Sequence, residues 1–191
     1  YVTDLALSQD GDIAVTVGNP DEVQVTDISY EGQVVDLSNL QPLSLFPLQG
    51  SRVKIKDNYA YTVGRNYPFG IVDISDHANP IITTLPYSAY DLVLSLDGNY
   101  VYLLSDTVDI MIFDISNPGS PELVNTFNIP GEHPSNYKYS VDLEISKDGP
   151  LLFVADGTGT SLLHIVDISN PSSLSYVNGI SLPEGFSPVL V

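Results

Sequence analysis

Residues 91–118 read DLVLSLDGNYVYLLSDTVDIMIFDISNP, and this stretch contains the unit from which the chain is built. It opens with strand a, whose apolar residues stand at alternate positions, as a pleated strand requires. Asp97-Gly98 is a tight-turn pair that leads into strand b, which carries Tyr100 and Tyr102. Strand c ends in Asp114-Ile-Ser116, and an Asn-Pro pair then marks the turn into strand d. The stretch therefore predicts four antiparallel strands joined by turns.

This unit recurs along the chain. Its Asp-Ile-Ser triplet occurs four times, at spacings of 46, 41 and 53 residues, a period typical of a four-stranded propeller blade. The triplets begin at Asp27, Asp73, Asp114 and Asp167. We predict an all-β fold of β-propeller blades, with four four-stranded antiparallel repeats, that belongs to a larger propeller or to an arc completed by another chain. The expected blades of this single domain or fragment, residues 1–191, are 1–49, 50–88, 89–138 and 139–185, with the start of a further blade at 186–191.

Strands b and c supply the predicted core. Tyr61, Tyr102 and Phe153 share one column of the repeat, so we expect them to occupy equivalent buried sites between blades. His164 lies among apolar residues of strand c, and we expect it to pack between blades as well. In the first repeat, residues 25–29 and 34–39 fit strand c equally well, and the sequence leaves both alternatives open.

The pattern of one repeat resembles a known family. Tyr100-Val-Tyr102, the run Ile112–Pro118 and Pro121 together resemble the LVIVD repeat of bacterial and archaeal surface propellers, and YVTN-type propellers share the strand b aromatics. The resemblance implies a secreted or surface-displayed β-propeller, and hence an extracellular, cell-surface or periplasmic location. It implies no common activity and no shared set of catalytic residues.

Composition restricts the partners of the chain. Six Lys plus Arg stand against 24 Asp plus Glu, a formal charge of −18, so nucleic-acid binding is excluded for want of clustered cations. Anionic membrane surfaces are disfavoured for the same reason, and no apolar run approaches the ~20 residues that span a bilayer. The chain has no cysteine, so disulfides and thiolate metal sites are excluded.

The b-c and d-a loops are the expected binding face, because in propellers these loops approach the channel where blades converge. Aromatic residues on this face can stack on a sugar ring or a peptide side chain. We therefore expect a protein or glycan partner, with self-association or blades from the rest of the protein as further contacts. The candidate binding residues are Arg65, Tyr67, Tyr87, Tyr90, His133 and Tyr137.

Carboxylates in the same loops suggest an alternative. Asp106, Asp109 and Asp156 occupy adjacent blades, and hard oxygen ligands of this kind suit calcium. Solvated acidic loops without a cofactor are the simpler interpretation. The aspartates of the Asp-Ile-Ser triplets end strands in separate blades, so we expect them to cap turns. The Asp-Gly pairs lack the further ligands of a calcium loop, so we expect hairpin turns there.

Two functional classes follow. The first is a non-catalytic binding or structural module of an exported or cell-surface protein. The second is a calcium-dependent hydrolase of the lactonase-like propeller kind, in which a channel metal would activate water. The sequence favours the first class, because no nucleophile motif and no second loop histidine accompany His133.

Overall fold

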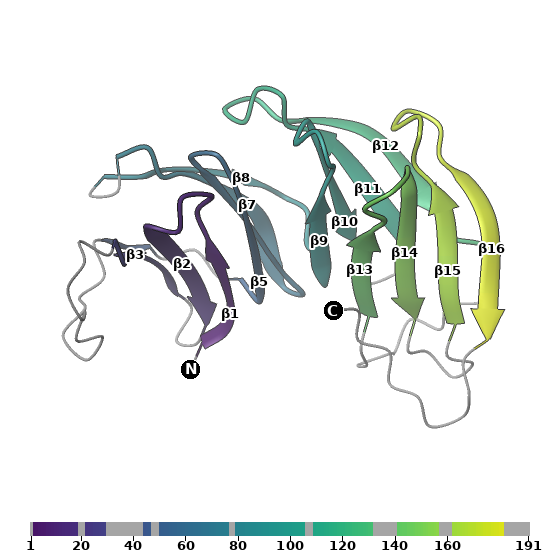
Figure 1. Cartoon of the computed structure of the whole chain (residues 1–191), viewed down its shortest axis with the longest axis horizontal. Helices are drawn as coiled ribbons and strands as arrows, with labels where there is room; N and C mark the ends of the chain where they lie inside the picture. Colours follow the sequence, from purple (N-terminus) through teal and green to yellow (C-terminus); the bar gives the residue numbers. More distant parts are fainter. Residues whose placement is uncertain are drawn as a thin grey trace. The chain divides into compact units, whose positions relative to one another are not determined.

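The computed structural model confirms the all-β prediction. All secondary-structure elements among the described residues are β-strands, and they form four-stranded antiparallel sheets (Figure 1). The chain forms two compact units, Tyr1–Ala89 and Tyr90–Val191. Within the described part of the chain, no helix is long and apolar enough to cross a membrane. The structure describes residues 2–18, 22–29, 44–46, 50–76, 79–105, 109–131, 141–156 and 162–181.

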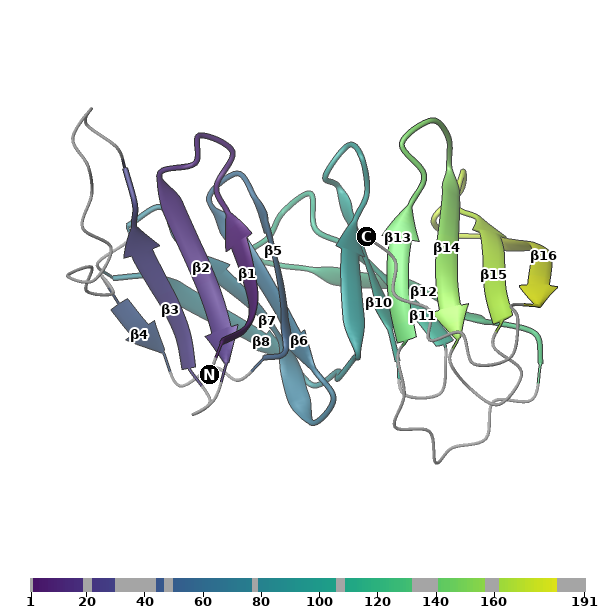
Figure 2. The same cartoon turned by 60° about the horizontal axis from the view of Figure 1, so that its bottom comes forward.

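The first unit contains two sheets whose strands lie side by side in chain order (Figure 2). The first sheet consists of β1 (Val2–Leu7), β2 (Ile13–Gly18), β3 (Glu22–Asp27) and β4 (Ser44–Phe46). The second consists of β5 (Arg52–Lys56), β6 (Tyr59–Gly64), β7 (Tyr67–Asp73) and β8 (Ile81–Leu85). Of the two segments that fit strand c of the first repeat, the earlier one contributes to β3, and residues 34–39 lie outside the described residues.

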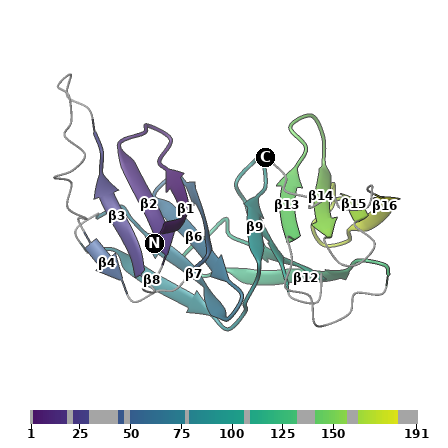
Figure 3. The ribbon, with the colours of Figure 1, turned by 90° about the horizontal axis from the view of Figure 1, so that it is seen from below.

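The second unit repeats the arrangement. Its sheets are β9 (Asp91–Leu94), β10 (Tyr100–Leu104), β11 (Asp109–Asp114) and β12 (Glu122–Asn128), and then β13 (Val141–Ile145), β14 (Leu151–Asp156), β15 (Leu162–Asp167) and β16 (Ser175–Ser181). β9 and β13 contact each other, and they appear as neighbouring strands in Figure 3. Within this unit, the backbones of the two blades thus approach each other at strand a, and strands b and c contribute side chains to the core between them.

Each residue of the Asp-Ile-Ser triplet has a structural role in the turn that follows strand c. The Asp114 carboxylate accepts hydrogen bonds from the Ser116 backbone N–H at 2.8 Å and from its hydroxyl at 2.6 Å. Ile115 donates its N–H to the Asn99 carbonyl, and its side chain is buried. The same carboxylate to backbone bond closes the other three triplets, at Asp27, Asp73 and Asp167. The predicted turn capping is therefore confirmed.

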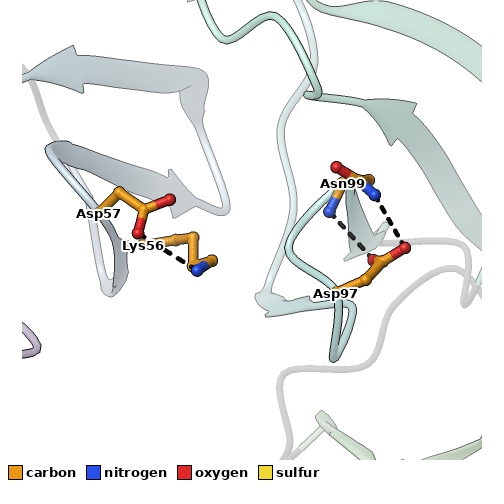
Figure 4. Close-up of polar contacts among 4 residues, drawn as sticks. All are labelled: Lys56, Asp57, Asp97 and Asn99. Atoms are coloured by element: carbon orange, nitrogen blue, oxygen red, sulfur yellow. Dashed lines mark hydrogen bonds and ion pairs between the residues drawn. The ribbon is translucent and has the colours of Figure 1, made fainter.

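The a-b turns use a second local network. Asp97 accepts hydrogen bonds from the backbone and side chain of Asn99 (Figure 4). It also accepts one from the Ser95 hydroxyl. Ser95 Oγ in turn accepts the Tyr100 N–H, and Gly98 adopts a φ of 72°, in the left-handed region that glycine tolerates. In the second repeat Asp57 takes that conformation with a φ of 51°, and its carboxylate pairs with Lys56 (Figure 4). The carboxylates of Asp10 and Asp97 thus serve their own turns, whereas Asp148 takes part through its backbone N–H, which donates to Ser146 Oγ.

Each unit has an apolar core between its two blades. In the first unit, β2 and β3 contribute Val15 and Val25, and the facing blade contributes Val53, Ala60 and Val72. All five side chains are buried. Side chains at alternate positions of each strand thus fill the space between the two sheets. This explains why apolar residues recur at every second position of the strands.

The second core lies between β9–β12 and β13–β16. Tyr102 and Ile112 pack against Leu143, Leu152 and Val166. Burial raises the pKa of the Tyr102 phenol to about 12, so this side chain enters the core as a neutral group.

The prediction for the strand b column is right for Tyr61 and Tyr102, each 1% exposed, and wrong for Phe153. Phe153 is only partly buried, because it lies on the face of the fourth blade opposite to the one that packs on the third. A shared position in the repeat therefore does not guarantee equal burial.

Candidate functional site

The b-c turn of the second blade holds the best-defined group of predicted binding residues. Arg65 is exposed and Tyr67 is partly exposed at the turn between β6 and β7. A Cβ atom added to Gly64 would lie 2.5 Å from Cδ2 of Tyr67 and 3.3 Å from the Ser51 nitrogen. The Tyr67 ring therefore lies directly against the Gly64 backbone, and only glycine leaves room for it there.

Tyr87 reaches the same end of this blade from the d-a loop. The Phe69 N–H donates to the Tyr87 carbonyl at 2.6 Å, one step beyond the pairing of Phe69 with Leu85. Tyr87 is thus held as an extension of the β7–β8 pair, at the end where Tyr67 begins β7. We call Arg65, Tyr67 and Tyr87 the tyrosine site of the first unit.

Three further residues were predicted to bind a partner, namely Tyr90, His133 and Tyr137. Tyr90 belongs to the second unit, is partly buried, and donates its N–H to the Leu104 carbonyl at 2.8 Å. His133 and Tyr137 lie outside the described residues. Their placement on the binding face stays a prediction.

Of the three aspartates proposed for calcium, only Asp109 has a described side chain. Its Oδ1 accepts a hydrogen bond from Asn128 Nδ2 at 2.6 Å, and its N–H donates to Ser105 Oγ at 3.0 Å. Asp106 lies outside the described residues, and Asp156 is described only as the last residue of β14. The described residues contain no group of three or more His, Cys, Asp or Glu side chains that could hold a metal ion. Calcium binding by these three aspartates stays untested.

Hollows at the opposite ends of the blades were not predicted. A cavity of about 460 Å³ in the first unit is lined by turn residues that include Asp10, Asp27 and Asp57. One of about 430 Å³ in the second unit is lined more by apolar residues, among them Leu96 and Tyr100. The sequence offers one sign of the second cavity, because Leu96 is an apolar residue at an a-b turn position where the first and fourth repeats have Gln9 and Lys147. In the structure Leu96 is 67% exposed.

His164 has a structural place, as predicted. Its side chain is fully buried, and Nδ1 lies 3.0 Å from the Tyr176 hydroxyl. A Cβ atom on Gly179 would lie 2.5 Å from that hydroxyl oxygen, so this glycine makes room for the contact. The ring is enclosed between blades, where packing rather than chemistry at a surface is its role.

The family model for the LVIVD repeat matches residues 49–84, 88–129 and 142–179, together more than half of the chain. The chain belongs to the LVIVD repeat family. The predicted resemblance is thereby confirmed, and the three matched stretches coincide with the second, third and fourth sheets. No curated protein matches this LVIVD-repeat chain in sequence.

Solved structures similar to the LVIVD-repeat chain include β-propellers. The periplasmic gluconolactonase PpgL of Pseudomonas aeruginosa superposes with a TM-score of 0.72 at 18% identity, over 98% of this chain and 59% of that one. The β-propeller domain of Cps50 (Swd1) from Myceliophthora thermophila gives 0.67 at 12% identity, over 94% and 58%. A protein of unknown function from Desulfotomaculum acetoxidans gives 0.70 at 21% identity, over 95% and 56%.

These likenesses concern the fold. The chain spans under two thirds of the length of each of these structures, which fits an incomplete propeller. At identities of 12 to 21%, they carry neither substrate nor active-site residues over to this chain.

Proposed function

We propose that this LVIVD-repeat chain is a non-catalytic binding or structural module of an exported or cell-surface protein, working outside the cell or in the periplasm. Its b-c and d-a loop face contacts a protein or a glycan. The observation that carries the proposal is the tyrosine site, where the partly exposed Tyr67 is fixed against Gly64 beside the exposed Arg65.

The tyrosine site has the properties of a binding surface. A tyrosine fixed by its neighbours loses little conformational entropy on binding, and its ring offers an apolar face to sugar C–H groups or to a side chain. Arg65 adds a planar group of five donors that fits hydroxyl or carbonyl acceptors. Together, Arg65, Tyr67 and Tyr87 favour recognition by stacking and hydrogen bonding.

The charge of the chain narrows the partner. A formal charge of −18 repels acidic molecules over several ångströms at physiological ionic strength. Neutral polysaccharides and basic protein surfaces are therefore favoured over uronic-acid polymers and acidic proteins.

Several described titratable side chains have structural tasks. The triplet aspartates bind turn N–H groups, and His164 contacts Tyr176 inside the blade pair. These roles support a binding module, because these particular groups serve to hold turns and core together.

Binding to immobilised neutral and uronic-acid polysaccharides and to a basic protein tests the proposal. We expect a neutral polysaccharide or the basic protein to bind, and Tyr67→Ala to weaken binding about tenfold, as the loss of one aromatic contact predicts. The matched control is Tyr59→Ala at the other end of β6, where the hydroxyl contacts Asp73. Absence of binding to every probe, or equal loss in both variants, would contradict the assignment.

The calcium-dependent hydrolase remains the alternative. The likeness to a gluconolactonase extends to the fold only, at 18% identity. The calcium experiment in the Discussion separates the two functions, because the hydrolase requires a specific ion and the binding module does not.

A further inference from the structure

The two cavities at the turn ends of the blades occupy equivalent places in the repeat but differ in chemistry. Each lies where the a-b turn of one blade meets the a-b and c-d turns of the next blade in the same unit. In the first unit the leading turn contributes Gln9 and the carboxylates of Asp10 and Asp12. In the second unit the corresponding turn contributes Leu96, and Tyr100 follows it. We call the second cavity, of about 430 Å³, the turn groove.

Leu96 is not needed for the a-b turn in which it lies. The Asp97 carboxylate accepts the Ser95 hydroxyl and the N–H two residues ahead. The first repeat makes both of these bonds at the equivalent positions with Gln9 in place of Leu96. A polar residue would therefore serve the turn equally well, and the exposed leucine calls for a reason outside the turn.

The floor of the turn groove is the end of the core between the third and fourth blades. Tyr102, Ile145 and Ile168 belong to that core, and all three also line the groove. Their exposed fractions lie between 1% and 7%. An apolar side chain that enters the groove would therefore continue the packing of the core.

Apolar residues of both blades border this floor. The third blade contributes Leu96 and the partly exposed Tyr100, and the fourth contributes the exposed Pro150 and the partly exposed Pro171. Both blades belong to the second unit, and all of their strands are described. A single exposed leucine is ordinary on a protein surface, but this one is part of an apolar surface that is continuous with the core.

Carboxylates determine the charge at the turn groove. Among its lining residues, all of which lie in the described part of the chain, Asp97 is the only charged one. Hydrogen bonds from the serine hydroxyl of the turn and from a backbone N–H lower the pKa of Asp97, so this side chain is ionised at neutral pH. Asp167 adds a second negative charge, since its carboxylate accepts the N–H of the lining residue Ser169. Lys147 and Asp148 of the neighbouring turn offset each other.

We propose that the turn groove binds a basic segment of a partner protein, with one apolar side chain of that segment against Ile145 and Ile168 and a lysine or arginine beside Asp97. A peptide fits better than a compact small molecule, because Leu96 is 67% exposed and a ligand confined to the floor would leave it uncovered. The positive charge of the segment follows from complementarity with Asp97 and Asp167 and with the formal charge of −18. This surface is separate from the tyrosine site, because a-b and c-d turns lie at the opposite ends of the strands from b-c and d-a loops.

An NMR titration of the isotope-labelled chain with the peptide Lys-Gly-Lys-Phe-Lys-Gly-Lys tests the proposal. We expect amide shift changes at Leu96, Gly149 and Ser169, which lie around the groove. A peptide with Ser in place of Phe should bind about tenfold more weakly, because the apolar anchor is lost. A peptide with Glu in place of every Lys should not bind, because its charge has the sign of the carboxylates at the groove.

Leu96→Gln introduces the residue type of the first repeat and keeps the bonds of the turn. It should leave the urea midpoint unchanged and weaken binding of the Phe peptide about tenfold. Leu123→Gln is the matched control, because Leu123 is a 43% exposed leucine on β12 of the same blade and does not line the groove. This variant should bind as the unmodified chain does.

Several results would overturn the proposal. These are the absence of shift changes, shift changes confined to the b-c and d-a loops, equal binding of the Phe and Ser peptides, and unweakened binding by Leu96→Gln. Shift changes at the same amides on raising the concentration of the chain alone would assign the groove to a second copy, and would overturn it as well.

Discussion

Asp91 of the third blade and Leu143 of the fourth are joined by a hydrogen bond of 2.8 Å between a carboxylate oxygen and a backbone N–H, and both residues are almost fully buried. The other oxygen of Asp91 accepts the N–H of Leu92 at 2.9 Å. One buried carboxylate thus ties two blades together while holding its own strand. Both oxygens of this side chain therefore accept backbone N–H groups, which is the arrangement a buried carboxyl group requires.

Replacing Asp91 with Ala should destabilise the second unit by about 3 kcal/mol, because two charge-assisted hydrogen bonds are lost and the Leu143 N–H loses one acceptor. Urea unfolding measures the change. Asp148→Ala in an exposed a-b turn is the control, and it should cost less than about 0.5 kcal/mol. Similar losses in the two variants would show that the bond between blades contributes little.

Truncating Tyr102 to Ala should cost ~3 kcal/mol or more, because its side chain fills the core between the third and fourth blades. Phe153→Ala removes a ring from the same column of the repeat, but from a partly exposed position, and should cost clearly less. Thermal or urea unfolding of the two variants checks the difference. Equal losses would mean that the outer face of the fourth blade is packed as tightly as its inner face.

Stability should decline in acid through the triplet aspartates. Hydrogen bonds from the serine hydroxyl and backbone N–H lower the pKa of Asp73 and Asp114 below the ordinary value, and at Asp167 the backbone bond is the larger cause. Because the folded-state pKa values lie below the unfolded ones, this stabilisation is present above about pH 4 and is lost as pH falls through the folded values.

Urea unfolding between neutral pH and pH 2.5 measures this effect. Ser116→Ala removes the hydroxyl that donates to Asp114, so it should flatten the acid part of the profile, and Ser116→Thr should restore it. A profile that is unchanged by Ser116→Ala would assign the acid sensitivity to other carboxylates.

Calcium should raise the melting temperature only as far as sodium chloride does at equal ionic strength, because screening relieves the repulsion within a chain of charge −18. Single carboxylates from separate loops rarely assemble the six to eight oxygens that calcium prefers. A calcium-specific rise, concentration-dependent as linkage requires and absent from Asp156→Asn, would contradict this expectation and favour the hydrolase.

The candidate binding site could be predicted only in part. The repeat alignment placed Arg65 and Tyr67 in a b-c turn and Tyr87 in a d-a loop, since loops follow from strand ends. The alignment could not show that Gly64 lies under the Tyr67 ring. That contact depends on a shift in the β6–β7 register between Thr62 and Gly64, which changes the course of the backbone there.

The sequence by itself determined the strands, through the alternation of apolar residues, and the turns, because the turn hydrogen bonds join residues a few positions apart. Asp114 caps Ser116, and Ser95 binds Tyr100, so four copies of these residues produce four copies of the turns. Only the tertiary structure decided which faces are covered. Leu5 and Leu143 occupy the same repeat position at 52% and 2% exposure, because burial depends on a blade about fifty residues away rather than on neighbours along the strand.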